Sequence, residues 1–107
     1  MPTTFSTVRT PERLLTIVLA YGYVVLFYAA LYRLLSIRTP NAFDRRLEDF
    51  VDAVYFSTIT IATVGYGDIT PRIVTAKLLV ISEVLFGILL LVFALAVVMA
   101  SRPPATE

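Results

Sequence analysis

The sequence predicts an all-α membrane protein in which two transmembrane helices flank a short helix that enters the membrane and returns. Of the 107 residues, 58% are hydrophobic, whereas roughly 45–50% is usual in soluble domains. A soluble fold of this length buries only about two-thirds of its unfolded surface, so it could not hide so many apolar side chains. Charged residues make up 16% and gather at the N-terminus, in residues 33–52 and at the two ends of the last apolar run. Two of the apolar runs are long enough to cross a bilayer.

The composition also narrows the classes of function. The chain has no cysteine and no histidine, which excludes disulfides, thiol catalysis and the usual zinc sites. Its net charge of +1 does not favour nucleic-acid binding. No set of acids or nucleophiles converges within the apolar runs, so we expect no enzyme, no cofactor and no small-molecule substrate. The length allows a single domain, residues 1–107.

The first apolar run contains nineteen uncharged residues, from Leu14 to Tyr32, close to the ~20 that a spanning helix requires. Thr10 and Pro11 are typical of a helix start, with threonine as the N-cap and proline at the first helical position. We therefore expect a helix over about 11–35, with Tyr32 at the membrane interface. A secretory signal peptide is the alternative, but its apolar core of about 7–15 residues is shorter.

The second long run, from Leu78 to Ser101, has 24 residues and is interrupted only by Glu83. As a helix it would span ~36 Å, enough to cross a membrane with some tilt. Thr70 and Pro71 again favour an N-cap followed by a first-turn proline. The sequence therefore predicts a second spanning helix over about 71–101.

Between the spans, the thirteen residues from Phe50 to Ala62 form an apolar run that is too short to cross. Runs of this length are typical of buried or re-entrant helices. Asp49 and Asp52 suit a helix N-terminus, where carboxylates meet unpaired N–H groups. We expect a re-entrant helix over about 50–62, with both chain termini on the same side of the membrane.

Residues 63–68, with the sequence TVGYGD, follow this short helix directly. Gly65 and Gly67 can adopt positive φ at little cost, so the backbone can alternate in φ and point its carbonyls the same way. Aligned carbonyls bind cations, and irregular backbone at membrane depth is tolerated where it lines a watery path. One copy supplies only one wall of such a site, so several chains must converge on an axis.

This motif between two spans resembles the selectivity filter of potassium channels. The stretch from Leu14 to Ala100 resembles their two-helix pore module, especially that of the short viral and prokaryotic channels. The resemblance implies a homotetramer in the membrane lipid, with an outer helix, a pore helix, a filter at 63–68 and an inner helix. It also implies passive conduction of dehydrated K⁺, which is both the permeant and a structural ion.

By this resemblance, K⁺ binds to backbone carbonyls of the first four filter residues and to the Thr63 hydroxyl. The side chains of Val64 and Tyr66 would face away from the axis and pack on the pore helix. The filter residues are Thr63, Val64, Gly65, Tyr66 and Gly67.

Residues near the filter are expected to support it. In many relatives two pore-helix tryptophans brace the filter, and here the matching positions hold Tyr55 and Phe56. We expect Tyr55 to hydrogen-bond Asp68, whereas Phe56 can only pack. Some relatives pair a pore-helix carboxyl with the aspartate after the filter, but this chain has Ile59 at that position.

The inner helix should line the rest of the pore. Gly87 stands where relatives often place a hinge glycine, and close helix packing through a small residue is an equally weighted alternative. Steps of four residues place apolar side chains on one face, with a hydrophobic constriction near the last of them. These candidates are Leu91, Leu95 and Met99, with Ile88 beside them.

Glu83 is an ionisable residue well inside the second span, which makes a functional site the default hypothesis. One interpretation is a structural carboxyl, protonated or hydrogen-bonded, with Ser57, Thr60 or Ser82 as its partner. Another is a pH-sensitive element that biases the filter or the hinge. Exposure to lipid is the third.

The resemblance places both termini in the cytoplasm and the protein in the plasma membrane or an equivalent cell membrane. The basic residues oppose this orientation, because cytoplasmic segments usually carry the excess of arginine and lysine. The expected outer side carries Arg33, Arg38, Arg45, Arg46, Arg72 and Lys77, and the inner side carries Arg9, Arg13 and Arg102.

The sequence leaves three functions to distinguish. The first is a potassium-selective channel. The second is a weakly selective monovalent cation channel, against which the complete TVGYG pattern argues. The third is a non-conducting membrane adaptor, in which an intact filter would serve no purpose.

Overall fold

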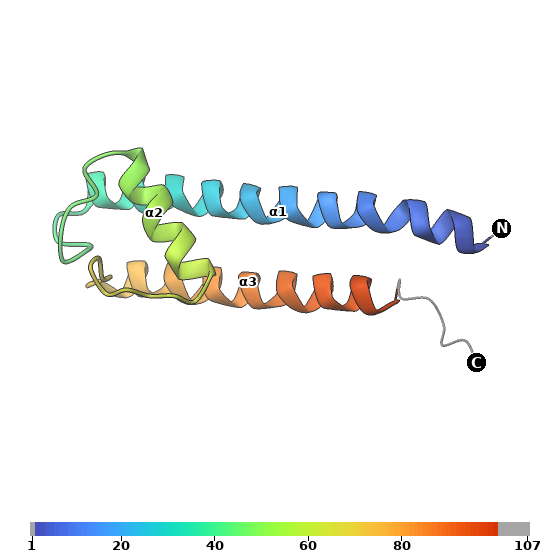
Figure 1. Cartoon of the computed structure of the whole chain (residues 1–107). Helices are drawn as coiled ribbons and strands as arrows, with labels where there is room; N and C mark the ends of the chain where they lie inside the picture. The colour runs from blue at the N-terminus through green and yellow to red at the C-terminus, as the bar shows by residue number, and fades with distance from the viewer. Residues whose placement is uncertain (1, 101–107) are drawn as a thin grey trace.

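The computed structural model describes residues 2–100, with side chains described from Pro11 onward. The side chain of Arg9, the expected helix end at Ser101, and Arg102 lie outside the described residues. The first and third helices run antiparallel and pack together, and the second lies across them near one end (Figure 1). The helices are α1 (Pro2–Arg38), α2 (Phe50–Ile61) and α3 (Val74–Ala100).

The first helix is longer than the predicted 11–35. It begins at Pro2 and runs through Pro11, so the expected start at Pro11 is wrong. A proline inside a helix costs about 3 kcal/mol and removes one hydrogen bond, but α1 continues on both sides of Pro11. The helix continues to Arg38 and ends before Pro40, because a proline disfavours helical backbone in the residue that precedes it.

The short helix α2 is capped at its start by two carboxylates. Asp49 is the N-cap, and its side chain accepts a hydrogen bond from the Asp52 backbone N–H at 2.9 Å. Asp52 in turn accepts one from the Glu48 N–H at 3.0 Å. These bonds satisfy N–H groups that a helix start leaves unpaired and place negative charge at the positive end of the helix dipole.

The third helix begins later than its sequence suggests. Pro71 lies in extended backbone that pairs as an antiparallel bridge with Phe43, and the Asp44 N–H donates to the Thr70 carbonyl at 2.9 Å. Backbone held in this pairing cannot be helical, so the predicted start at Pro71 is wrong and α3 begins at Val74. The pairing ties the loop after α1 to the loop before α3.

Most of the buried side chains lie where α2 crosses between α1 and α3. Tyr32 is fully buried there, with its ring edge-on to those of Phe56 and Phe43 at centroid distances of 4.9 and 5.9 Å. Tyr32 therefore packs inside the protein, because α2 and the preceding loop fold over it. The core consists mainly of Tyr28, Ala29, Tyr32, Ala42, Phe43, Leu47, Ala53, Phe56, Ile69 and Ala76.

Away from this junction the two long helices are apolar but uncovered. Each is long and apolar enough to cross a membrane, and only 17% and 11% of their most apolar windows are buried within the chain. A core helix of a soluble protein would be mostly buried. The architecture is therefore that of a membrane protein with two spans, joined by a short helix and two loops.

Candidate functional site

The backbone of the filter segment (residues 63–68) alternates in φ. Gly65 and Gly67 have φ of +56° and +86°, as their position in the motif predicts. Thr63 also has a positive φ, +58°, which is unusual for a β-branched residue and marks local strain. Its hydroxyl donates to the Ala62 carbonyl at 2.6 Å. Positive φ therefore recurs at every second residue, at positions 63, 65 and 67, which is the alternation that the expected carbonyl alignment requires.

The first three N–H groups of the filter segment bond to the end of α2. Those of Val64 and Gly65 both donate to the Ile59 carbonyl, at 2.9 and 3.1 Å, and that of Thr63 donates to the Thr60 carbonyl at 3.0 Å. Among the described residues, no hydrogen bond reaches the carbonyls of residues 63–66. The segment therefore presents a row of free carbonyl oxygens, which are ligands suited to a hard cation.

A hydrogen bond anchors the far end of the filter segment. The Tyr55 hydroxyl of α2 donates to Asp68 Oδ2 at 2.7 Å, so the bond expected between these residues is present. This bond to a carboxylate raises the pKa of the Tyr55 phenol, because it stabilises the protonated form. The neighbouring Phe56 turns the other way, into the core, where its ring meets that of Phe43 at 5.3 Å.

The C-terminal end of α2 is held between the two long helices. The Tyr21 hydroxyl on α1 donates to the Ile61 carbonyl at 3.4 Å. On α3, Gly87 lies so close that a Cβ atom there would be 2.6 Å from Ile61 Cγ1 and 3.0 Å from the Ile61 carbonyl oxygen. Of the two interpretations of Gly87, the structure shows close helix packing.

The candidates for the inner pore lie on α3, on the C-terminal side of Gly87. Their side chains are exposed in the single chain, but so are those of Leu89, Val92 and Phe93. The helix is apolar on all sides here, as expected for a helix that lies between lipid and other apolar surfaces. The exposed candidates are Ile88, Leu91, Leu95 and Met99.

Glu83 is fully buried at the point where all three helices meet. The Tyr32 hydroxyl donates to Glu83 Oε1 at 2.8 Å, and Ser57 Oγ lies 2.6 Å from Oε2. This burial excludes exposure to lipid. Of the three expected partners only Ser57 is bonded to Glu83, since Ser82 pairs instead with the Tyr28 hydroxyl at 2.7 Å.

Sequence reasoning did not identify the specific hydrogen bonds that the tyrosines of α1 make. The hydroxyls of Tyr21, Tyr28 and Tyr32 each bond to a group on α2 or α3. Their spacing of seven and four residues places them on one helix face, whereas Tyr23, off that face, is 71% exposed. This spacing was the signal that could have identified the face of α1 that packs on α2 and α3.

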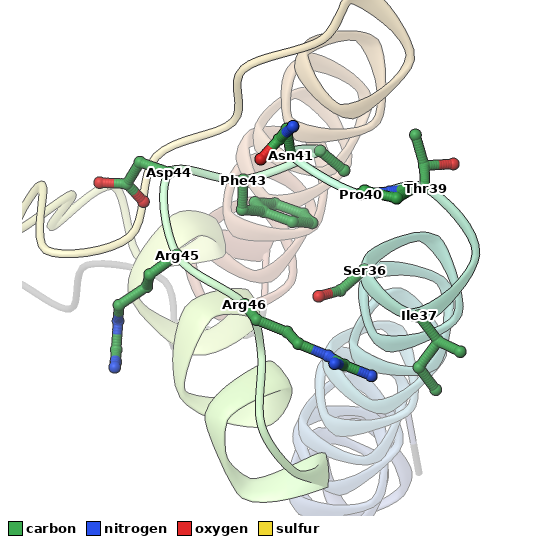
Figure 2. A pocket seen from close by; sticks show the side chains of 10 residues that line it. Ser36, Ile37, Thr39, Pro40, Asn41, Phe43, Asp44, Arg45 and Arg46 are labelled. Atoms are coloured by element: carbon green, nitrogen blue, oxygen red, sulfur yellow. The ribbon is translucent and has the colours of Figure 1, made fainter.

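A polar pocket of about 300 Å³ lies in the loop that follows α1 (Figure 2). It contains none of the expected site residues. One of its residues, Asp44, accepts a hydrogen bond from the Thr70 N–H at 2.8 Å, which lowers the pKa of the Asp44 carboxyl. A second, Ser36, accepts from the Leu47 N–H at 3.0 Å. The contacts of the lining residues therefore stabilise the loops around α2.

Comparison with known proteins shows that parts of this chain are similar to potassium channels. The chain is 57% identical over 42 residues to a hyperpolarization-activated voltage-gated potassium channel of Methanocaldococcus jannaschii, which is 39% of this chain and 20% of that protein. It is 43% identical over 61 residues to the voltage-gated potassium channel Kch of Escherichia coli, which is 57% of this chain and 13% of that protein. With two pore potassium channel a of Oryza sativa, identity is 39% over 74 residues, 69% of this chain and 19% of the rice protein.

The chain thus spans a fifth or less of the length of these relatives. Its match to the family described as ion channels is more extensive and covers residues 13–101. That range includes both spanning segments, α2 and the filter segment. The chain belongs to the ion channel family.

Proposed function

We propose that the protein is a potassium-selective channel that conducts K⁺ passively through the filter segment. The observation that carries this proposal is the alternation of φ along residues 63–67, which leaves a row of carbonyls free to replace the hydration shell of the ion. The relatives named above are potassium channels, and their matched stretches support the same ion. No cofactor is needed besides K⁺ itself.

The active unit that we propose is a homotetramer. A single chain surrounds an ion on one side only, and closed symmetry supplies the remaining sides. Val64 and Tyr66 are 49% and 70% exposed, which is unfavourable for apolar and aromatic side chains unless a neighbouring chain covers them. Behind the filter segment lies an apolar pocket of about 320 Å³, lined in part by Ile59 and Val84, into which a neighbouring chain can pack.

The direction of α2 also favours a cation. Its C-terminal end leads directly into the filter segment, and the helix dipole gives that end about half a negative charge. In a symmetric assembly four such ends would face the same central space. They would stabilise a cation there as it enters the filter.

We further propose that both termini are cytoplasmic and that the membrane is the plasma membrane or its equivalent. The first described residues of α1 and the end of α3 lie at the same end of the molecule, opposite the loop that follows α1 and the loop that precedes α3 (Figure 1). The basic residues near those loops oppose the orientation, although acids such as Asp44, Asp52 and Asp68 offset their charge locally. Because the chain has no cysteine, single cysteines introduced at Arg45 or Thr7 and labelled with an impermeant reagent decide the orientation.

Single-channel recording of the purified protein in planar bilayers tests the function. With K⁺ on both sides at unequal concentrations and Na⁺ making up the difference, the current should reverse near the K⁺ equilibrium potential. A reversal potential near zero would favour the weakly selective cation channel. Absence of current from a correctly inserted protein would contradict conduction altogether.

A further inference from the structure

The three helices meet at one buried carboxyl group, that of Glu83. Glu83 is the only charged residue within the two apolar runs of the sequence, and it is fully buried together with Tyr32 of α1 and Ser57 of α2. Hydrogen-bond distances join it to both hydroxyls. The proposed conduction path does not use this group, so its role needs a separate explanation.

The hydrogens available for the contacts of Ser57 indicate whether the Glu83 carboxyl is protonated. Ser57 Oγ lies 2.6 Å from Glu83 Oε2 and 2.8 Å from the Val25 carbonyl oxygen. A serine hydroxyl has one hydrogen, while a carbonyl and an ionised carboxylate can only accept. If Glu83 were ionised, one of these two short contacts would hold no hydrogen, and two oxygen lone pairs would face each other.

A proton on Glu83 Oε2 removes this conflict. Glu83 then donates to Ser57, Ser57 donates to the Val25 carbonyl, and Tyr32 donates to Glu83 Oε1. Each of the three contacts has its own hydrogen, and each buried polar oxygen has a partner.

The surroundings also lack a charge that could stabilise a carboxylate. Within the described part of the chain, Glu83 has no ion pair with a lysine or arginine. Arg33, next to Tyr32, points instead to the Glu48 carbonyl at 3.1 Å, and the Tyr28 hydroxyl is paired with Ser82. Among the residues whose side chains the structure describes, the only titratable group in direct contact with Glu83 is the Tyr32 phenol. An unpaired ionised carboxylate in such surroundings is strongly disfavoured.

We propose that Glu83 is a neutral carboxylic acid that donates to Ser57, and that this bond positions α2 and thereby the filter segment. Ser57 lies on α2 two residues before Ile59, whose carbonyl accepts from Val64 and Gly65. A shift of α2 at Ser57 therefore moves the group that holds the start of the filter. Glu83 is a positioning residue, and its effect on the filter rests on the proposed function, whereas its neutral state does not.

The neutral state is tested by infrared spectroscopy of the purified protein at neutral pH. The difference spectrum between wild type and Glu83→Gln isolates this one group. A carboxylic acid C=O band that is lost in the variant is the expected result. A carboxylate band lost in its place would overturn the proposal.

The positioning role is tested by ion selectivity. The amide of Glu83→Gln can donate to Ser57 and accept from Tyr32, so this variant should retain the K⁺ over Na⁺ preference. Ser57→Ala and Glu83→Leu remove the bond and should lose that preference, while Ser82→Ala, which removes a hydroxyl pair at the same depth without touching α2, should not.

The pH profile adds a readout that a merely structural contact would not move. Raising the pH should weaken selectivity in wild type by ionising Glu83, and should leave Glu83→Gln unchanged. Retained selectivity in Ser57→Ala would refute the positioning role, and so would identical pH profiles for wild type and Glu83→Gln over a pH range in which the infrared C=O band of Glu83 disappears. A wild type without K⁺ current would overturn the proposed function and the positioning role with it, while the infrared band would still decide the neutral state.

Discussion

Gly65 and Gly67 are the residues on which the filter geometry depends most directly. An alanine at their positive φ values costs about 1–2 kcal/mol per residue through its own backbone. In the single chain an added Cβ would meet no other atom within 4 Å, so the penalty is conformational. We expect Gly65→Ala and Gly67→Ala to lose K⁺ selectivity, measured as a reversal potential shifted toward that of a non-selective pore.

Gly22 offers a matched control for these two variants. It lies in α1, has no positive φ, and a Cβ there would also meet nothing within 4 Å. Gly22→Ala should therefore keep normal selectivity. Wild-type reversal potentials in both filter variants would contradict the proposed carbonyl filter.

Asp44 allows a prediction about pH at the loops around α2. Its hydrogen bond from the Thr70 N–H lowers the pKa of its carboxyl. A carboxyl whose pKa is lower in the folded state stabilises the fold above its unfolded pKa, and this contribution is lost as the pH falls through the folded value. Asp44→Ala should therefore lower the thermal midpoint at neutral pH, with a smaller difference from wild type in acid.

The control for Asp44 is Glu48→Gln, because the Glu48 side chain makes no hydrogen bond within the described residues. Its difference from wild type should be small at both pH values. A constant difference between Asp44→Ala and wild type across the acid range would show that the charge of Asp44 has no part in stability.

At the level of single residues, the sequence predicted what depends on local chemistry. The motif alone indicates positive φ at Gly65 and Gly67, and the reach of a phenol to a nearby carboxylate predicts the bond from Tyr55 to Asp68. It did not predict the positive φ of Thr63, which occurs where the N–H groups of the segment bond back to α2. Nor did it place Tyr32, because that depends on a loop folding over α1.

At the level of helices, the predicted starts at Pro11 and Pro71 were wrong because helix boundaries depend on long-range contacts as well as on local sequence. Pro11 and Pro71 both follow a threonine, and both were interpreted as first-turn prolines. Pro11 lies inside α1, while Pro71 is held extended by its bridge to Phe43, 28 positions earlier in the sequence. The existence and order of the three helices follow from apolar run lengths, whereas these boundaries depend on contacts that a sequence pattern does not contain.

The junction of α2 with α3 gives a prediction at this scale. Gly87→Ala would place a methyl group 2.6 Å from Ile61 Cγ1. Overpacking of this kind costs about 1–3 kcal/mol, more than the helix propensity of about 1 kcal/mol that alanine gains over glycine. We expect a lower thermal midpoint and weaker selectivity, because α2 must move.

Ile61→Ala should partly restore the stability of Gly87→Ala, since it removes the side-chain atom that the new methyl meets. If Gly87 serves as a hinge instead, Gly87→Ala would alter open probability while leaving the thermal midpoint unchanged. That outcome would show that close packing is not the main reason for a glycine at this position.

At the level of the whole molecule, the single chain leaves the filter segment exposed and its carbonyls without hydrogen-bond partners among the described residues. Tyr66 is 70% exposed, while the carbonyls of the filter segment have no partner among the described residues. Lipid can cover the outer faces of α1 and α3, but it cannot replace the ligands that a cation needs on its other sides. Under the proposed function, further copies of the chain and the ion supply these missing contacts.

The last prediction follows from this mutual dependence. An ion that binds only the assembled filter stabilises the assembly by mass action, so the tetramer should withstand heating or detergent better in K⁺ than in Na⁺. Gly65→Ala disturbs the filter carbonyls, while its added methyl group meets no other atom within 4 Å in the single chain. This variant should abolish the difference in tetramer stability between K⁺ and Na⁺. The measurement is the fraction of tetramer that remains after heating, by native mass spectrometry or size-exclusion chromatography. A wild-type tetramer equally stable in both ions would contradict a structural role for K⁺, and a monomer or dimer that still conducts would contradict the tetramer itself.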